Sequence, residues 1–167
     1  MLNAFETDRL YLRPFERGDL ADLFGLYASA SVMHYITATR TREETEIRLR
    51  KHMEDRARHG FGLFATILKA NGAFVGRCGL DPVVIDGRLE GDIAWMFAPT
   101  YWNRGFATEF GHRMLEIGFR DLGLPRIFAT AHRENVASIR VMEKLDMDYV
   151  AMQGQRVEYE RLRSSLA

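Results

Sequence analysis

The sequence has few cysteines, few prolines and no excess of charge of either sign. Its 167 residues include one cysteine, Cys78, which excludes an internal disulfide framework and a cysteine-rich zinc site. Basic and acidic residues number 23 each, so the chain lacks the broad positive charge with which many proteins attract nucleic acid. Apolar runs such as residues 61–68 are too short to cross a membrane. We therefore predict neither a nucleic-acid partner nor a membrane partner.

Several sequence signatures of ligand sites are also missing. There is no G-x-x-x-x-G-K-[ST] loop for nucleotide phosphates, and no G-x-G-x-x-G turn follows the first predicted strand. The five histidines do not have the spacing of metal ligands, so we expect no metal. Residues 1–6 lack the basic and apolar regions of a secretion signal. Together with the single cysteine, this predicts a cytoplasmic protein.

The hydrophobic pattern predicts one mixed α/β domain over residues 1–167. Hydrophobic residues make up 47% of the chain and charged residues 28%, which is typical of a globular protein. Alternating positions predict strands at residues 9–13, 61–69, 74–80, 92–98, 126–131, 149–152 and 157–162. Steps of three and four predict helices at residues 18–28, 41–59, 104–122 and 134–145. We expect Asp19 to cap the first helix, a capping box at Thr41, and turns at Asn71-Gly72 and Asp86-Gly87.

A turn with small residues precedes the long helix predicted over residues 104–122. Gly105 and Ala107 lie in its first turn, where backbone N–H groups lack internal partners and the helix dipole is positive. Small side chains let a phosphate approach those groups, and Arg104 adds a charged donor. The segment therefore predicts a pyrophosphate site. Taken alone, the glycine favours a structural interpretation, in which Gly105 permits an unusual turn and Ala107 packs against the sheet.

A second segment carries Asn135, Ser138 and Met142 on one stripe of the helix over residues 134–145. Asn135 is a favourable N-cap residue. Taken alone, this pattern is also consistent with a purely structural role.

Five segments in order along the chain resemble the GCN5-related N-acetyltransferase (GNAT) superfamily, and within it the RimJ/RimL-like branch. They span nearly the whole chain and are residues 6–14, 76–80, 92–95, 101–109 and 135–145. The resemblance implies a mixed, mostly antiparallel sheet of about seven strands flanked by helices. It also implies a V-shaped splay between the fourth and fifth strands, at residues 92–98 and 126–131.

Three positions depart from the pattern of the superfamily. Trp102 stands where Gln or Arg is frequent, and Met142 stands where a Tyr is frequent, so a phenol acid is absent there. Asp146 replaces the usual Gly after the helix over residues 134–145. An Asp can adopt the left-handed conformation that such a helix end requires.

The resemblance implies that acetyl-CoA, used without a metal, donates its acetyl group directly to a primary amine of a protein N-terminus or a small molecule. The residues it places against acetyl-CoA are Trp95, Met96, Phe97, Ala98, Asn103, Arg104, Gly105, Phe106, Ala107, Thr108, Asn135, Ser138 and Arg140. Ser138 is the predicted donor to the leaving sulfur. Glu90 and Asp92 are candidate bases that act through water, and His34 and Tyr35 are candidate acceptor-binding residues.

Alternatives remain open for these residues and for the whole chain. A solvated surface position is the other interpretation of Glu90, Asp92 and Arg140. The chain as a whole is also compatible with an acetyl-CoA-binding regulatory or interaction module without turnover, or with an interaction domain that binds no cofactor. The sequence is compatible with a homodimer and does not decide the oligomeric state or the acceptor.

Overall fold

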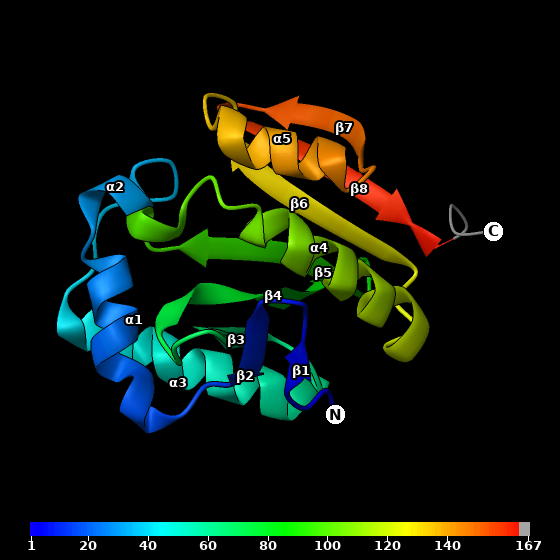
Figure 1. Ribbon diagram of the computed structural model, residues 1–167. Coiled ribbons are helices and arrows are strands. Elements are labelled where there is room, and N and C mark those ends of the chain that lie inside the picture. Colours follow the sequence, from blue (N-terminus) through cyan, green and yellow to red (C-terminus); the bar gives the residue numbers. More distant parts are fainter. Residues whose placement is uncertain (164–167) are drawn as a thin grey trace.

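A computed structural model describes residues 1–163, and its centre is one eight-stranded sheet in the order β1-β2-β3-β4-β5-β6-β8-β7 (Figure 1). The strands are β1 (Phe5–Glu6), β2 (Leu10–Pro14), β3 (Leu63–Leu68), β4 (Phe74–Ile85), β5 (Arg88–Phe97), β6 (Arg126–His132), β7 (Asp148–Gln153) and β8 (Arg156–Leu162). Neighbouring strands are antiparallel except for β5 and β6, which are parallel. The predicted fold class is confirmed. The predicted domain also includes residues 164–167, which lie outside the described residues.

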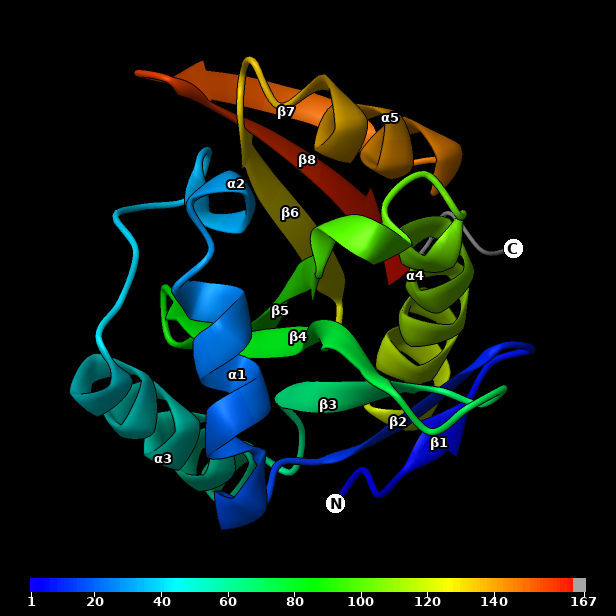
Figure 2. The same ribbon diagram turned by 60° about the vertical axis from the view of Figure 1, so that its left-hand side comes forward.

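Helices cover both faces of this sheet, as Figures 1 and 2 show together. They are α1 (Leu20–Tyr27), α2 (Ala30–Met33), α3 (Arg42–His59), α4 (Phe106–Glu116) and α5 (Val136–Lys144). One buried cluster joins α1 and α3 to one face of the sheet, and a larger one joins α4 and α5 to the other. Burial of these apolar side chains is the main stabilising term of the fold. No helix in residues 1–163 has both the length and the apolar character that crossing a membrane requires.

The β4–β5 hairpin is longer than predicted. Asp86 and Gly87 both have positive φ, at 49° and 76°, as a two-residue hairpin turn requires, so the predicted turn is confirmed. The predicted strands stop at residue 80 and start again at residue 92, whereas β4 and β5 continue up to this turn, with Pro82 inside β4. Pro82 is tolerated because pairing of β4 with β3 ends at Gly79, so the position without an N–H faces an edge that has no partner strand.

The helix predicted over residues 104–122 is shorter and has two parts. It begins at Phe106, because Gly105 has a left-handed φ of 78° and lies outside the helix as its N-cap. The α-helical part ends at Glu116, and the wider π-helical winding of Ile117–Asp121 follows. A side chain at Gly118 would meet the Ile127 side chain at 2.4 Å, so this winding lies directly against β6. Hydrophobic spacing does not distinguish such a winding from an α-helix.

At three of four helix ends, the observed capping is the one that the sequence predicts. Thr41 accepts a hydrogen bond from the Glu44 amide and completes the predicted capping box of α3, which ends at Gly60 with φ 82°. Asp146, with φ 53°, ends α5 in the left-handed conformation expected of it. Asp19 is the N-cap residue of α1, but its carboxylate accepts no hydrogen bond from α1; it accepts from Arg13 at 2.7 and 2.8 Å and from the Glu16 amide at 2.8 Å, which closes a capping box on the preceding turn.

Candidate active site

Strands β5 and β6 pair over two residues and then diverge. Gly91 is in register with Ile127 and Asp92 with Phe128, and no later residue of β5 has a partner on β6 within the described chain. The Ala98 amide donates to the Val75 carbonyl, so alternation along β5 turns the N–H and C=O groups of Trp95 and Phe97 away from β4. The predicted splay is therefore present, and it exposes backbone donors at the end of β5.

The turn before α4 presents a row of unpaired backbone amides beside this splay. Within residues 1–163, the N–H groups of residues 104–108 have no hydrogen-bond acceptor, and no side chain caps the helix. Asn103 and Gly105 both have left-handed φ, at 59° and 78°, which turns the chain sharply into α4. An anion such as a pyrophosphate fits this arrangement, since the amides and the helix dipole favour negative charge there.

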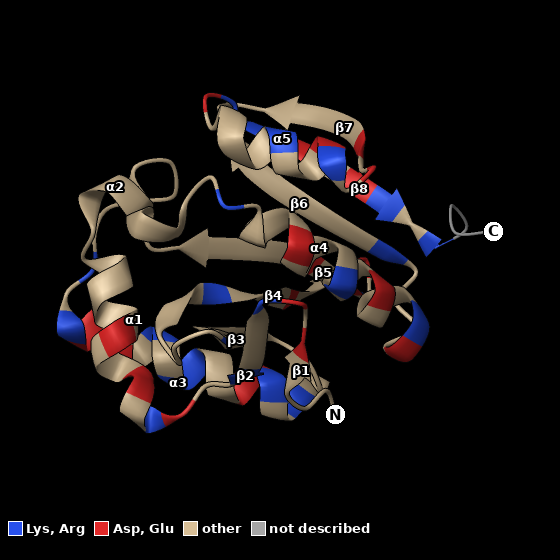
Figure 3. Ribbon diagram, in the orientation of Figure 1, with Lys and Arg blue, Asp and Glu red and all other residues tan. Residues whose placement is uncertain are grey.

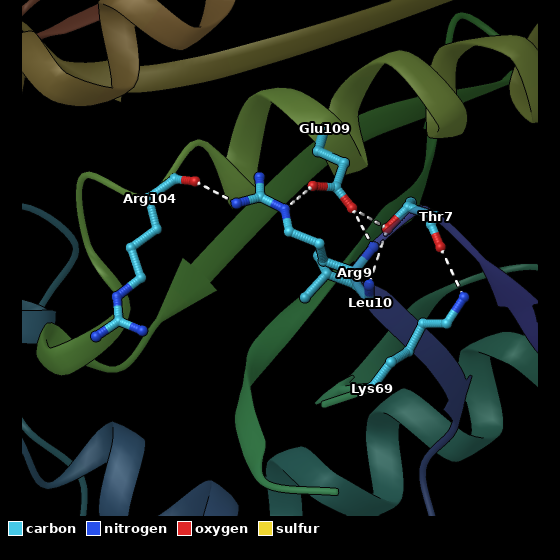
Figure 4. A network of polar contacts seen from close by, with 6 residues as sticks. All are labelled: Thr7, Arg9, Leu10, Lys69, Arg104 and Glu109. Atoms are coloured by element: carbon cyan, nitrogen blue, oxygen red, sulfur yellow. Dashed lines mark hydrogen bonds and ion pairs between the residues drawn. The ribbon is translucent and has the colours of Figure 1, made fainter. Parts of the chain in front are cut away.

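Arg9 ties this turn to the N-terminal strand, as Figure 4 shows. Its Nη1 donates to the Arg104 carbonyl at 2.9 Å, and its Nε donates to Glu109 Oε2 at 2.6 Å. The guanidinium also lies 4.5 Å above the Phe106 ring. Burial opposes the ionisation of Glu109, but hydrogen bonds from Thr7 and Arg9 lower its pKa, so the carboxylate remains a strong acceptor. Sequence reasoning did not assign these roles, although Thr7 and Arg9 belong to the segment 6–14 noted above.

Trp102 joins the same turn to the end of β5. Its indole Nε1 donates to the Phe97 carbonyl at 2.7 Å. The Phe97 and Phe106 rings pack at 6.0 Å, and Arg104 lies 5.4 Å from the Tyr101 ring. The turn and the strand end are therefore held as one unit, which fixes the amides of residues 104–108 relative to the splay.

Comparison with known proteins identifies this arrangement. The family model described as an acetyltransferase (GNAT) domain matches residues 9–148. The chain belongs to the GNAT acetyltransferase family. It is 33% identical to the uncharacterized N-acetyltransferase YnaD of Bacillus subtilis (strain 168) over 142 residues, which cover 84% of this chain and 80% of YnaD.

Solved structures agree with the family. A GNAT-family acetyltransferase from Bacillus anthracis has a TM-score of 0.83 and 28% identity, over 96% of this chain and 99% of that one. The spermidine N-acetyltransferase of Vibrio cholerae, in complex with CoA and spermine, has a TM-score of 0.78 and 22% identity, over 93% and 96% of the two chains. The latter likeness is one of fold alone. The GNAT enzyme described here is thus an acetyl-CoA-dependent acetyltransferase.

Helix α5 places Asn135 and Ser138 of this GNAT enzyme next to each other. Asn135 is the N-cap, and its side-chain oxygen accepts a hydrogen bond from the Ser138 amide at 3.2 Å. Ser138 is partly buried, and its hydroxyl makes no hydrogen bond to residues 1–163, including the carbonyl one turn earlier. Met142 is fully buried in the core, whereas Arg140 is exposed. The Ser138 hydroxyl is therefore available to a ligand.

The two candidate bases lie in different surroundings. Asp92 is directly opposite Asp81 on β4, and burial, followed by the charge of Asp81, raises the pKa of Asp92 to about 7. Glu90 is buried instead against Arg126, which donates to its Oε2 at 2.7 Å. Arg126 also binds Glu158 and Glu160 on β8. Asp92 is thus the carboxylate poised to exchange a proton near neutral pH.

The predicted acceptor-binding residues meet β6 near its end. Tyr35 stacks on His132 with ring centroids 5.5 Å apart, and His34 packs edge-on against Tyr35 at 4.5 Å. His132 Nδ1 accepts a hydrogen bond from the Glu134 amide, just before the N-cap of α5. Sequence reasoning set His132 aside because no metal spacing surrounds it. The structure thus brings Tyr35 to the side of the splay opposite the turn before α4.

Cys78 takes no part in this arrangement. It is fully buried, and burial raises the pKa of its thiol to about 12, so it remains a protonated packing residue.

Proposed function

We propose that the enzyme transfers the acetyl group of acetyl-CoA directly to a primary amine of a protein N-terminus or a small molecule. The observation that carries this proposal is the row of unpaired amides at residues 104–108, fixed beside a strand end that has left its partner. The spermidine N-acetyltransferase of similar fold was solved with CoA and spermine, a thiol carrier and an amine, which supports this pairing of ligands.

We assign the pyrophosphate of acetyl-CoA to the amides of residues 104–108 and to the Arg104 side chain. The free edge of β5 at residues 95–98 would then pair with the pantetheine arm, since the outward N–H groups of Trp95 and Phe97 and the Trp95 C=O need partners, whereas the Phe97 C=O already accepts from Trp102. Asn135, the N-cap of α5, and Arg140 are assigned to the other side of this arm.

In the proposed reaction, acetyl-CoA supplies an activated acetyl group as a thioester. The outward N–H of Phe97 donates to the carbonyl oxygen as it gains charge, an effect worth about 3–4 kcal/mol for one well-placed donor. Asp92 accepts a proton from the incoming ammonium through water, because only the neutral amine has a lone pair to attack with. Glu90 is not retained as a base, since Arg126 occupies its carboxylate.

Ser138 is assigned the last step, in which its hydroxyl donates a hydrogen bond to the departing thiolate, directly or through water, while the sulfur takes up the proton that the acetylated nitrogen releases. Its hydroxyl has no acceptor among the described residues, which leaves it available for this role. The Ser138→Ala variant should lower kcat by about 10- to 100-fold while KM for acetyl-CoA changes by less than about twofold.

A thiol-release assay over a mixed panel of amine acceptors tests the proposal. The enzyme should release CoA only when an acceptor amine is present. Ser31→Ala, at an exposed serine on α2, is the matched control and should keep full kcat. Full kcat in Ser138→Ala would remove Ser138 from the mechanism. Tight binding of acetyl-CoA without thiol release for any amine would instead identify a binding module without turnover.

A further inference from the structure

A buried Tyr–His pair lies between the sheet and the helices α1 and α3. The Tyr27 hydroxyl and His52 Nε2 are 3.1 Å apart, and the residues are 2% and 3% exposed. Burial, and after it the positive charge of Arg77, lowers the pKa of His52 well below its ordinary value. His52 is therefore neutral at physiological pH, and the charges around the pair come from other side chains.

Three arginines surround this pair. The guanidinium carbons of Arg40 and Arg77 each lie 5.8 Å from the Tyr27 ring centroid. Arg48 precedes His52 by one turn on the same face of α3, and Figure 3 marks basic positions on the ribbons of α3 and β4 in blue. All three arginines are partly buried.

None of these three guanidinium groups has a partner among the described residues. They donate no hydrogen bond within residues 1–163, and no carboxylate there comes within 4.0 Å of them. The Nε atoms of Arg48 and Arg77 are completely buried and unpartnered. Buried donors are nearly always hydrogen-bonded in folded proteins, so the unpartnered Nε atoms of Arg48 and Arg77 indicate an external acceptor.

The acidic residues nearby do not neutralise this cluster. Asp55 is already paired with Lys51 at 2.7 Å. Burial raises the pKa of Asp81, and it raises the pKa of Asp92 to about 7, so Asp92 carries less than a full negative charge near neutral pH. The arginines therefore keep an excess of positive charge on the face of the sheet that also carries Asp92.

We propose that Arg40, Arg48 and Arg77 form an anion-binding subsite for the acetyl acceptor, which is a primary amine that also carries a carboxylate or phosphate group. This inference rests on the function proposed above. Arg77 is in register with Met96, at the level where β5 has left β6, and it lies on the same face as Asp92. An acceptor held by its anionic end there would present its amine toward the splay. The planar fork of a guanidinium matches both carboxylate and phosphate oxygens.

The test compares acceptors that differ only in the charge of the second group. The measured quantity is kcat/KM with acetyl-CoA for amino acids, their carboxamides, an aminoalkyl phosphate and spermine. The anionic acceptors should exceed the carboxamides by about 10- to 100-fold, since hydrogen bonds between charged groups are the stronger kind. Comparison of the carboxylate with the phosphate acceptor decides between the two anionic groups.

Variants locate the preference in the subsite. Arg48→Gln and Arg77→Gln should each reduce the ratio of kcat/KM for carboxylate over carboxamide by roughly tenfold. The ratio is the proper readout, because Arg77 also favours the ionised form of Asp92 and so affects every acceptor alike. Arg50→Gln, on the exposed face of the same helix, is the matched control and should leave the ratio unchanged.

The outcomes separate the subsite from the proposed function. Equal rates for acid and amide, or a preference for spermine, would overturn the subsite while leaving amine acetylation intact. If no amine is acetylated, the proposed function fails, and thermal shifts with N-acetylamino acids and their amides in the presence of CoA test the subsite alone. A shift specific to the acids that is lost in Arg48→Gln and kept in Arg50→Gln supports it, and the absence of such a shift overturns it.

Discussion

Arg9 connects the N-terminal segment to the turn before α4. Arg9→Gln removes its hydrogen bonds to the Arg104 carbonyl and to Glu109. The amides of residues 104–108 then lose part of their fixed position, so KM for acetyl-CoA should rise by about tenfold while kcat stays within about twofold. Steady-state kinetics measures both, with the exposed Arg17→Gln as control. A fall in kcat at unchanged KM would contradict this role.

Asp92 gives a prediction about pH, again at the scale of one residue. Its pKa is about 7 in the folded enzyme and about 3.9 in an unfolded chain, so the folded state holds a proton that the unfolded state has lost. The contribution of Asp92 to stability therefore falls as pH rises from about 4 to about 7, and then stays constant. The difference in melting temperature, Asp92→Asn minus wild type, should therefore increase from pH 5 to pH 8.

Ionisation of Asp92 should increase activity, although it decreases stability. The wild-type kcat/KM should rise with pH until about pH 7, and Asp92→Asn should lack this rise and lose at least about tenfold in rate. Asp148→Asn, an exposed aspartate on β7, should change neither profile. A melting-temperature difference between Asp92→Asn and the wild type that is independent of pH would show that Asp92 keeps an ordinary pKa.

At the scale of elements, the C-terminal end of α5 has its capping hydrogen bonds, but it places a non-glycine residue in the left-handed conformation. The Met147 amide donates to the Met142 carbonyl and the Asp146 amide to the Glu143 carbonyl, with Asp146 left-handed between them. Asp146→Gly should therefore raise the free energy of unfolding by about 0.5–1 kcal/mol, measured in urea. The ion pair lost with Arg161 spans 3.8 Å at an exposed carboxylate and contributes little. Glu143→Gly, inside the helix, should destabilise by about 1 kcal/mol, and a lower urea midpoint for Asp146→Gly would contradict the argument.

The elements also show what sequence reasoning can and cannot reach. The capping box at Thr41 and the turn at Asp86 are local, because neighbouring residues decide them, and both were predicted correctly. The length of β4 depends on where β3 stops beside Pro82, which no local pattern contains. The two-residue β1 is likewise stabilised by its partner strand. In the site, the turn at Gly105 is locally encoded, whereas the contact of Arg9 with Glu109 joins residues 100 positions apart.

At the scale of the whole molecule, Arg126 clamps the closed end of the splay. From β6 it binds Glu90 on β5 and two glutamates on β8, with its own side chain 19% exposed. Arg126→Gln would leave three carboxylates without their cation and should cost about 2–3 kcal/mol in urea unfolding, less than for a fully buried pair. Arg120→Gln, at a side chain 73% exposed, should cost under about 0.5 kcal/mol. Equal stability of the two variants would show that the clamp contributes nothing.

The sheet consists of two blocks, strands β1–β5 and strands β6–β8. Two residue pairs of parallel pairing and the ion pair of Arg126 with Glu90 form the seam between them. So short a seam leaves the open ends of β5 and β6 without strand pairing, although one apolar core packs against both blocks. A long thin ligand lying between β5 and β6 would bridge both blocks and act as an added strut. Amide hydrogen exchange at Ile127 and Phe128 should consequently slow on addition of CoA, although these residues lie at the far end of the wedge from the amides of residues 104–108.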